Sequence, residues 1–583
     1  MGDDAGVPNV IGGHRQQARA SPKVLYEKRI RVRVMARSPV GPIPARAWPT
    51  LLAVAFGVLV VALDGAVVAV ASPSIAVALR ADAAGIQWVV TAQSLATVGL
   101  AIPAGTLADK FGRKKVFLCG VAGFALCSLV CGLAGSIGFL IGARIAQGAF
   151  AALILPAALA IVRAAFPPSR LPTALGLFGS VTALASAGGP LLGGVLVEYA
   201  GWHWVFLINL PFGVLAVLLG AFVIRESAEP GSKRLDLAGA ITATAAVVGL
   251  IWAITGAQEH GWASAWTLRY LALSALAFGS FLVIERVVAH PMVPPGLFRD
   301  RSFTAGLVLQ ALAQAALTGV VFGLMFYLQG VRALGGTAAA VALLPLTVTV
   351  VVAAPLAGVL TQKLGARTTL LLGAGAFAAA FASLLRLAPD SSMAEVVPSL
   401  LLVAVGAGLL MVASMEAILG NTPVGNAGVV GGVKQAALEL GGTVGVAATS
   451  ALLVSVVNSR FPNAVRTAFP SADPVAGRIA DDPQVRQDVT LGFPPPARQH
   501  LSDQLGNVGA RVPNPVDTVT DAAHHTFVFG LHVVCGAGLA IAVAAAALAL
   551  LVRGRSSDNL AGQHDPEQTV ATIGTLSSEG AVS

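Results

Sequence analysis

Long apolar stretches recur along the chain between about residues 49 and 552, and short polar segments separate them. Fourteen of these stretches are long enough to cross a hydrocarbon core of about 30 Å as helices of about 20 residues. Their residues do not alternate in polarity, as those of membrane-spanning strands would. Because a helix satisfies its own backbone hydrogen bonds in lipid, the pattern predicts an all-α polytopic membrane protein. We expect the spans at residues 49–71, 86–104, 116–134, 139–162, 173–197, 204–224, 237–256, 268–288, 304–329, 336–360, 368–387, 396–419, 432–457 and 526–552.

The composition of the chain agrees with an embedding in lipid and excludes several other classes of protein. Of its 583 residues, 56% are hydrophobic and 11% are charged, whereas soluble domains carry about 25% charged residues. A disordered chain, a disulfide scaffold and a water-soluble enzyme are therefore excluded as its main body. The cysteines lie in apolar runs without a CxxC pair, so neither a disulfide framework nor a metal site is expected. They are Cys119, Cys127, Cys131 and Cys535.

The basic residues predict the orientation of the spans. With the N-terminus inside, the inner segments collect most of the lysines and arginines, including those of residues 1–47 and 110–115. By the positive-inside rule, and with an even number of spans, both termini are expected in the cytoplasm. This asymmetry explains the net charge of +9 without a nucleic-acid partner. The short outer loops hold only Arg80, Arg269, Arg332 and Arg386.

Polar segments lie before, between and after the spans. The basic N-terminal tail, residues 1–47, has no apolar core before Leu51, so a cleaved signal peptide is not expected, and Met35 is an alternative start. The outer segment 458–525 holds six arginines and seven aspartates but no apolar run. We expect disorder or partial order there rather than a small ordered cap. Residues 553–583 are polar and are expected to form a disordered cytoplasmic tail.

The segment from Gly105 to Lys115, between the second and third spans, reads GTLADKFGRKK. Its glycines allow a tight turn and a close approach of helices, its acid can face a helix N-terminus, and its basic residues hold it at the inner leaflet. A degenerate copy, GVLTQKLGAR, lies between spans ten and eleven with Gln362 in place of the acid. This copy is expected to keep the turn and to lose the charge interaction. The candidate gating loop consists of Gly105, Asp109, Gly112, Arg113 and Lys114.

The fifth span carries closely spaced small residues. Gly176 and Ala185 precede a cluster that reads GPLLGG. Small residues let membrane helices pack closely, and a proline bends the helix that contains it. These residues form either a specific transport motif or an ordinary small-residue packing face. The candidate motif consists of Gly176, Gly189, Pro190, Gly193 and Gly194.

Three ionisable residues inside the spans are candidate functional residues, because charges are rarely placed in a bilayer without a role. Asp64 lies near the middle of the first span, where an isolated carboxylate favours its neutral form. It is therefore a candidate proton or substrate site, with a hydrogen-bonded structural aspartate as the alternative. Arg144 lies about six residues inside the fourth span, so it either faces a partner or snorkels to the surface. Glu416, near the inner end of the twelfth span, is a second candidate acid unless it reaches water.

These motifs resemble those of the major facilitator superfamily. The loop from Gly105 matches the signature GxLaDrxGrkx, and span five is similar to the antiporter pattern, with Ala185 in place of one glycine. The segments around Asp64 and Arg144 resemble the motifs lDxTvvNvALP and lxxxRxxqGxgaa, although alanines replace the Thr and Asn of the first. The chain is thus similar to the fourteen-span drug:proton antiporters of this superfamily, the EmrB/QacA type.

The resemblance, together with the offset of eight spans between the two loops, implies a 6 + 2 + 6 arrangement of helices in the major facilitator fold. An N-terminal six-helix bundle is expected at residues 48–224, two accessory helices with linkers at 225–302, and a C-terminal six-helix bundle at 303–552. The outer segment 458–525 belongs to the C-terminal bundle. The two bundles are expected to rock about a cavity near the midplane.

The resemblance also implies a proton-coupled exporter of lipophilic drugs or antibiotics, with cationic compounds as one option, that works by alternating access. Asp64, Arg144 and Glu416 are then the candidate residues for proton coupling and substrate binding. The proton gradient supplies the energy, so no cofactor or metal is expected, and no phosphate loop, nucleophile signature or metal-ligand spacing indicates an enzyme. The expected partners are a small lipophilic substrate, protons and the bilayer, for a monomer in the cytoplasmic membrane of a bacterium.

Other functions are compatible with the same pattern. An exporter of a lipid, a siderophore or a metabolite would suit a wide apolar cavity equally well. A non-transporting membrane sensor or assembly factor, and an uptake symporter, are weaker alternatives. The gating loop, the small residues of span five and the intramembrane acid Asp64 favour an exporter over both.

Overall fold

The computed structural model describes residues 44–553 except for 82, 228–235, 289–290, 421, 423–425, 470–473 and 506–513. Within the described residues, every regular element is helical. The alternative start Met35, most of the basic tail and nearly all of the segment 553–583 lie outside the described residues.

Fourteen described helical stretches can serve as membrane spans. Thirteen are long and apolar enough by themselves to cross a membrane. The remaining one is α6, Leu171–Tyr199, whose 29 residues include the shorter apolar stretch Leu171–Ala185. The expected all-α fold with fourteen membrane helices is therefore confirmed.

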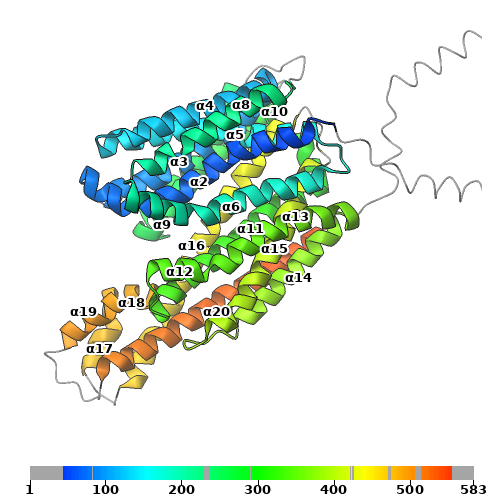
Figure 1. Ribbon diagram of the computed structural model, residues 1–583. Coiled ribbons are helices and arrows are strands. Elements are labelled where there is room, and N and C mark those ends of the chain that lie inside the picture. Colours follow the sequence, from blue (N-terminus) through cyan, green and yellow to red (C-terminus); the bar gives the residue numbers. More distant parts are fainter. Residues whose placement is uncertain are drawn as a thin grey trace, which may run out of the picture. The chain divides into compact units, whose positions relative to one another are not determined.

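The N-terminal bundle is formed by α2 to α8, drawn in blue to teal in Figure 1. Helix α2 packs against α6 and α8, and α3 and α4 pack against α5. Gly112 turns the chain from α3 into α4 at a φ of +103°, a conformation that residues with a side chain rarely adopt. The helices are α2 Ala47–Leu79, α3 Ala83–Phe111, α4 Arg113–Gly132, α5 Ile137–Ala165, α6 Leu171–Tyr199, α7 Trp204–Leu207 and α8 Asn209–Val223.

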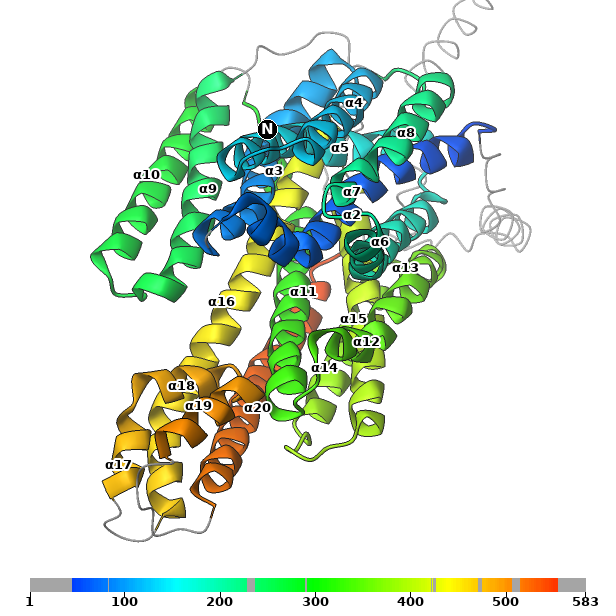
Figure 2. The same cartoon turned by 60° about the vertical axis from the view of Figure 1, so that its left-hand side comes forward.

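Two accessory helices, α9 (Leu237–His260) and α10 (Ala265–Val287), follow the N-terminal bundle. They form a hairpin that lies beside α3 and α16 in Figure 2. The hydroxyl of Thr244 donates a 2.7 Å hydrogen bond to the carbonyl oxygen of Gly99 and thereby ties α9 to α3. The pair is thus attached to the N-terminal bundle, as two helices inserted between the halves would be.

The C-terminal bundle packs around a core rich in aromatic and aliphatic side chains, among them Phe377, Phe381 and Phe527. A short 3-10 helix, Pro295–Arg299, leads into it, and a π-helical turn, Tyr327–Val331, extends its first helix. The helices are α11 Arg301–Phe326, α12 Gly336–Ala342, α13 Leu344–Leu364, α14 Ala366–Leu384, α15 Met393–Leu419, α16 Ala427–Ala468 and α20 Pro515–Ala549.

We expected disorder or partial order in the outer segment 458–525, whereas most of its described residues are helical and form a small ordered unit. Helices α16 and α20 extend into it, and three short helices lie between them, at one end of the C-terminal bundle in Figure 1. Val485, Val489 and Phe493 are buried against Phe461 and other apolar side chains of the extended helices. Each short helix alone has too few apolar residues to be noticed in the sequence, but together they bury a small core. They are α17 Pro474–Asp481, α18 Pro483–Thr490 and α19 Pro495–Leu505.

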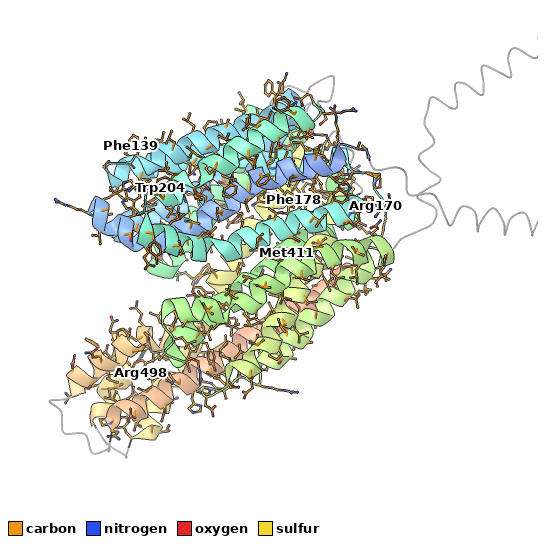
Figure 3. All side chains as sticks on the ribbon, in the orientation of Figure 1. Phe139, Arg170, Phe178, Trp204, Met411 and Arg498 are labelled. Carbon is orange, nitrogen blue, oxygen red and sulfur yellow. The ribbon has the colours of Figure 1, made fainter. Side chains whose placement is uncertain are left out.

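The two bundles meet where α3 packs against α16 and where α6 packs against α13 and α15. Figure 3 labels Phe178 and Met411 at the second junction. Backbones approach most closely at the end of the bundles that carries the gating loop, which we call the basic end. A Cβ atom built on Gly105 of α3 would overlap the carbonyl group of Gly428 at the start of α16. Small residues therefore allow the bundles to close on each other there.

Candidate functional site

Asp64 and Arg144 form an ion pair inside the N-terminal bundle. Asp64 is on α2 and Arg144 on α5, and their side chains are 0% and 1% exposed. Arg144 Nη1 donates to Asp64 Oδ2, and its Nε donates to the carbonyl oxygen of Val89 at 3.0 Å. The pair thus ties three helices together, because Val89 belongs to α3.

Amide and hydroxyl side chains complete the hydrogen bonds of this ion pair. Gln147 Nε2 and Asn209 Nδ2 donate to Asp64 Oδ1 at 3.1 and 2.8 Å, and Arg144 donates to Gln147 Oε1 at 2.9 Å. Asn209 Nδ2 also donates to Ser128 Oγ at 2.9 Å. We call these five buried residues the Asp64 network. Together they give each oxygen of the Asp64 side chain at least one donor, and hydrogen bonds between charged groups are the strong ones.

The network changes two interpretations of the sequence. Asp64 is not an isolated carboxylate in lipid, because a guanidinium and two amides surround it. Arg144 faces a partner and does not snorkel to the surface, since its side chain is almost completely buried. Within the described residues, one polar atom of the network, Asn209 Oδ1, is buried without a hydrogen-bond partner.

The gating loop holds the N-terminal bundle to the start of α16. Both carboxylate oxygens of Asp109 accept hydrogen bonds from the backbone N–H of Gly428, at 3.1 and 3.0 Å, and one also accepts from that of Val429 at 3.1 Å. Arg113 donates to Asp109 Oδ1 through Nε at 3.0 Å and Nη2 at 2.8 Å, and so orients the carboxylate. The negative charge lies at the positive end of a helix dipole and binds amides that the helix leaves free.

The basic residues after Gly112 attach this loop to the end of α8. Lys114 Nζ donates to the carbonyl oxygen of Ala221 at 2.6 Å. The backbone N–H groups of Lys114 and Lys115 donate to the carboxylate of Glu226 at 3.2 and 3.3 Å. Glu226 belongs to none of the sequence motifs described above. The only signal in the sequence was the position of an acid just after a span.

A second charged contact joins the bundles at the basic end. Arg163, in the last turn of α5, donates to the carbonyl oxygens of Leu419 and Gly420 at 3.0 and 3.3 Å, where α15 ends. The cation lies at the negative end of that helix dipole. Thus the N-terminal bundle places the carboxylate of Asp109 at the start of α16 and the guanidinium of Arg163 at the end of α15. A basic residue in the last helical turn was the signal that could have singled out Arg163.

Glu416 lies one helical turn before this contact and far along the chain from the other candidates. Its carboxylate interacts electrostatically with Arg163, and its Oε2 atom is buried without a hydrogen-bond partner among the described residues. Glu416 as a whole is half-buried, with its Oε2 atom shielded. The structure places it at the contact between bundles and does not bring it together with the Asp64 network.

The small residues of span five lie along α6 in two groups. Gly176 contacts the backbone of α13 at Ala354, across the junction of the bundles. Gly189 and Gly193 contact α2 at Ala66 and Val67, within three residues of Asp64. A Cβ atom built on Gly194 would meet no atom of another element within 4 Å among the described residues, and the side chain of Pro190 is outside the described part of α6. The motif thus packs α6 closely against the helix that carries Asp64.

The comparisons with known proteins agree with this architecture. Residues 54–446 match the Major Facilitator Superfamily. The chain is 36% identical over 536 residues to the tetracenomycin C resistance and export protein of Streptomyces glaucescens. The aligned region covers 91% of this chain and 96% of that protein. It is also 36% identical to a puromycin resistance protein of Streptomyces alboniger, over 70% of this chain and 82% of that protein. The chain therefore belongs to the Major Facilitator Superfamily.

A solved structure shows the same fold. The crystal structure of the human organic anion transporter MFSD10 aligns with 86% of this chain and 100% of its own length, with a TM-score of 0.55 and 14% sequence identity. Fold and family are those of a multi-pass membrane transporter rather than an enzyme.

Proposed function

We propose that the protein exports lipophilic small molecules, including cationic drugs or antibiotics, across the cytoplasmic membrane of a bacterium and is driven by proton entry. The export part is supported by the relatives, which are named for resistance to tetracenomycin C and puromycin. The observation that carries the proton-coupled part is the Asp64 network, a carboxylate buried beside a cation within the transport fold.

The basic end faces the cytoplasm in this proposal. It carries Lys110, Arg113, Lys114 and Lys115, and anionic lipid headgroups favour such residues on the inner side. The contacts of Asp109 and Arg163 then close the cytoplasmic side and must break before a substrate can enter from there. Both bundles and both contacts come from one chain, so neither contact needs a second copy, and we propose a transporter that works as a monomer.

Proton binding to Asp64 acts by removing the charge that holds Arg144. A protonated Asp64 needs an acceptor, and the unpaired Oδ1 of Asn209 supplies one when the amide turns over. Gly189 and Gly193 pack α6 against α2 at this level, so a change at Asp64 is passed to α6, which contacts the C-terminal bundle. Entry of one proton under a membrane potential of 100 mV supplies about 2.3 kcal/mol.

Transport in inverted membrane vesicles tests the proposal. A proton gradient is imposed, and the uptake of ethidium, a fluorescent lipophilic cation, is followed for the wild type and for Asp64→Asn. A matched control is Ser399→Ala. This variant removes a 2.9 Å hydrogen bond between two serines of the C-terminal bundle, Ser399 and Ser383. We expect gradient-dependent uptake by the wild type and the control, and none by Asp64→Asn.

The alternative results are equally clear. Well-folded wild type that takes up no ethidium, puromycin or other lipophilic drug contradicts drug export and favours a specialised lipid or metabolite exporter. Equal uptake by wild type and Asp64→Asn contradicts a coupling role of the Asp64 network.

A further inference from the structure

A half-open cavity lies outside the Asp64 network, where the accessory helices meet the rest of the molecule. It has a volume of about 450 Å³ and is lined by α3, α9, α10 and α16. None of the residues of the Asp64 network or the gating loop lines it. The side chains that give it its chemical character are Trp88, Trp252, His260, Trp266 and Glu439.

Three tryptophans from three helices form a continuous aromatic wall. The ring centroids of Trp88 and Trp252 are 4.9 Å apart, and those of Trp252 and Trp266 are 6.4 Å apart. His260 stacks on Trp266 with centroids 4.5 Å apart and planes 5° from parallel. Rings in such contact hold one another in place, so the wall is rigid and presents flat faces. The space suits a flat, aromatic ligand.

The charge of the lining favours a cation. Glu439, on α16, is the acidic residue among those that line the space, and Gln435 Nε2 donates to its Oε1 at 3.0 Å. Lys434 interacts electrostatically with Glu439 but does not line the space. His260 Nδ1 lies 3.1 Å from the carbonyl oxygen of Gly256, which leaves Nε2 of the neutral ring as an acceptor. Indole faces also attract cations through their quadrupole.

The volume agrees with the same class of ligand. Binding sites for small molecules usually measure about 300–1,000 Å³ and combine apolar walls with a few polar groups. Here the polar groups are the carboxylate of Glu439 and the hydroxyls of Thr91, Thr255 and Thr443. Because α3 and α16 belong to different bundles, the site also spans the junction that opens and closes during transport.

We propose that this space is a binding site for a planar aromatic monovalent cation, with Trp88, Trp252 and Trp266 as its walls and Glu439 as its counter-charge. The site is separate from the Asp64 network, and binding to it requires neither a proton gradient nor transport. It assigns to the accessory helices a role in ligand binding. The proposal therefore stands or falls independently of proton-coupled export.

Photolabelling of the purified full-length protein in detergent micelles tests the site. Ethidium monoazide is bound in the dark, crosslinked by light, and located by peptide mapping. We expect label on residues 237–287 in the wild type. Labelling at this place should weaken about tenfold, or about 1.4 kcal/mol, in Glu439→Gln, which loses the counter-charge, and in Trp252→Leu, which loses a cation–π contact.

Two further variants make the test decisive. Trp48→Leu removes a tryptophan that packs on Phe166, away from the site, and should label like the wild type. Trp252→Phe keeps an aromatic face and should restore most of the labelling if Trp252→Leu folds poorly. Equal labelling of 237–287 in all variants, or label found only elsewhere, overturns the proposal. Competition by a neutral lipid but not by unlabelled ethidium also overturns it, because the space then holds an acyl chain.

Discussion

Each half of the molecule carries a copy of the loop between its second and third membrane helices, and the two copies act through different chemistry. Both turn through a glycine at positive φ, Gly112 at +103° and Gly365 at +87°. In the first copy the carboxylate of Asp109 binds backbone N–H groups at the start of α16. In the second copy Gln362 Oε1 accepts a 2.9 Å hydrogen bond from the hydroxyl of Thr173 near the start of α6.

The helix that each copy meets explains the difference. Helix α6 has Pro172 in its first turn, and proline has no N–H to donate. Helix α16 begins at Ala427, and the amides of its next two residues, Gly428 and Val429, donate to the acid. A negative charge therefore stabilises the contact of the first loop with α16 but has no corresponding donor at Pro172 beside the second loop. The expectation that the second copy keeps the turn and loses the charge interaction agrees with these contacts, and the structure adds the neutral hydrogen bond of Gln362.

The same contrast holds inside the bundles. In the N-terminal half α2 and α5 are joined by the ion pair of Asp64 and Arg144. In the C-terminal half the corresponding helices, α11 and α15, are joined by a neutral hydrogen bond of 2.8 Å from Ser414 Oγ to Gln310 Oε1. A neutral pair has no proton to gain or lose near neutral pH. Of these two contacts, only the one in the N-terminal half is made by ionisable side chains, while Glu416 lies elsewhere on α15.

The largest effect is expected from breaking the buried ion pair. Arg144→Ala leaves the carboxylate of Asp64 buried without its counter-charge, which costs about 3–5 kcal/mol. Gln310→Ala removes only a neutral partner, and Ser414 Oγ keeps a 3.1 Å contact to the carbonyl oxygen of Met411, so about 1 kcal/mol is expected. Thermal unfolding in detergent micelles measures both. Similar losses of stability in the two variants would contradict a difference between the charged helix pair of the N-terminal half and the neutral pair of the C-terminal half.

The next effect is expected at the first loop. Asp109→Asn removes the charge that binds the start of α16, and hydrogen bonds to charged groups are worth about 1.5–3 kcal/mol. The amides of Gly428 and Val429 should then exchange hydrogen for deuterium about tenfold faster or more. The start of α6 serves as the internal control, because no contact of Asp109 reaches it. Unchanged exchange at Gly428 would contradict a gating role for Asp109.

A smaller effect is expected at the second loop. Thr173→Val keeps the shape of the side chain and removes one neutral hydrogen bond to Gln362, which is worth about 0.5–1.5 kcal/mol. Exchange at the start of α6 should rise only a few-fold, and drug transport should be retained. A loss of transport as complete as that of Asp109→Asn would mean that the two loops contribute equally.

The smallest effect on the stability of the start of α6 is expected when a charge is introduced into the second loop. Gln362→Asp alone should not stabilise the start of α6, since Pro172 offers no N–H. Gln362→Asp combined with Pro172→Ala supplies the missing donor, and about 0.3–1 kcal/mol is expected from the acid at the helix N-terminus. Slower exchange of the Thr173 amide in the double variant only would support the explanation. Equal protection in both variants would rule out the proline as its cause.

Local patterns in the sequence were sufficient for the spans, for both loops and for the candidate charges. Each depends on residues close together in the chain: about 20 apolar residues make a span, and a glycine with an acid three residues before it makes the turn of the first loop. The buried acid Asp64 and base Arg144 are visible for the same reason, because a charge within an apolar run stands out.

The pairing of these residues was decided only by the tertiary structure. Asp64 and Arg144 are 80 positions apart, and Asn209 is 145 positions from Asp64, so nothing local indicates that they share one network. The order of the outer segment and the aromatic space at Trp252 likewise arise when helices distant in the chain pack together. Helix packing alone determines which buried charge meets which partner. That pairing, rather than the presence of either residue, separates a bound carboxylate from an isolated one.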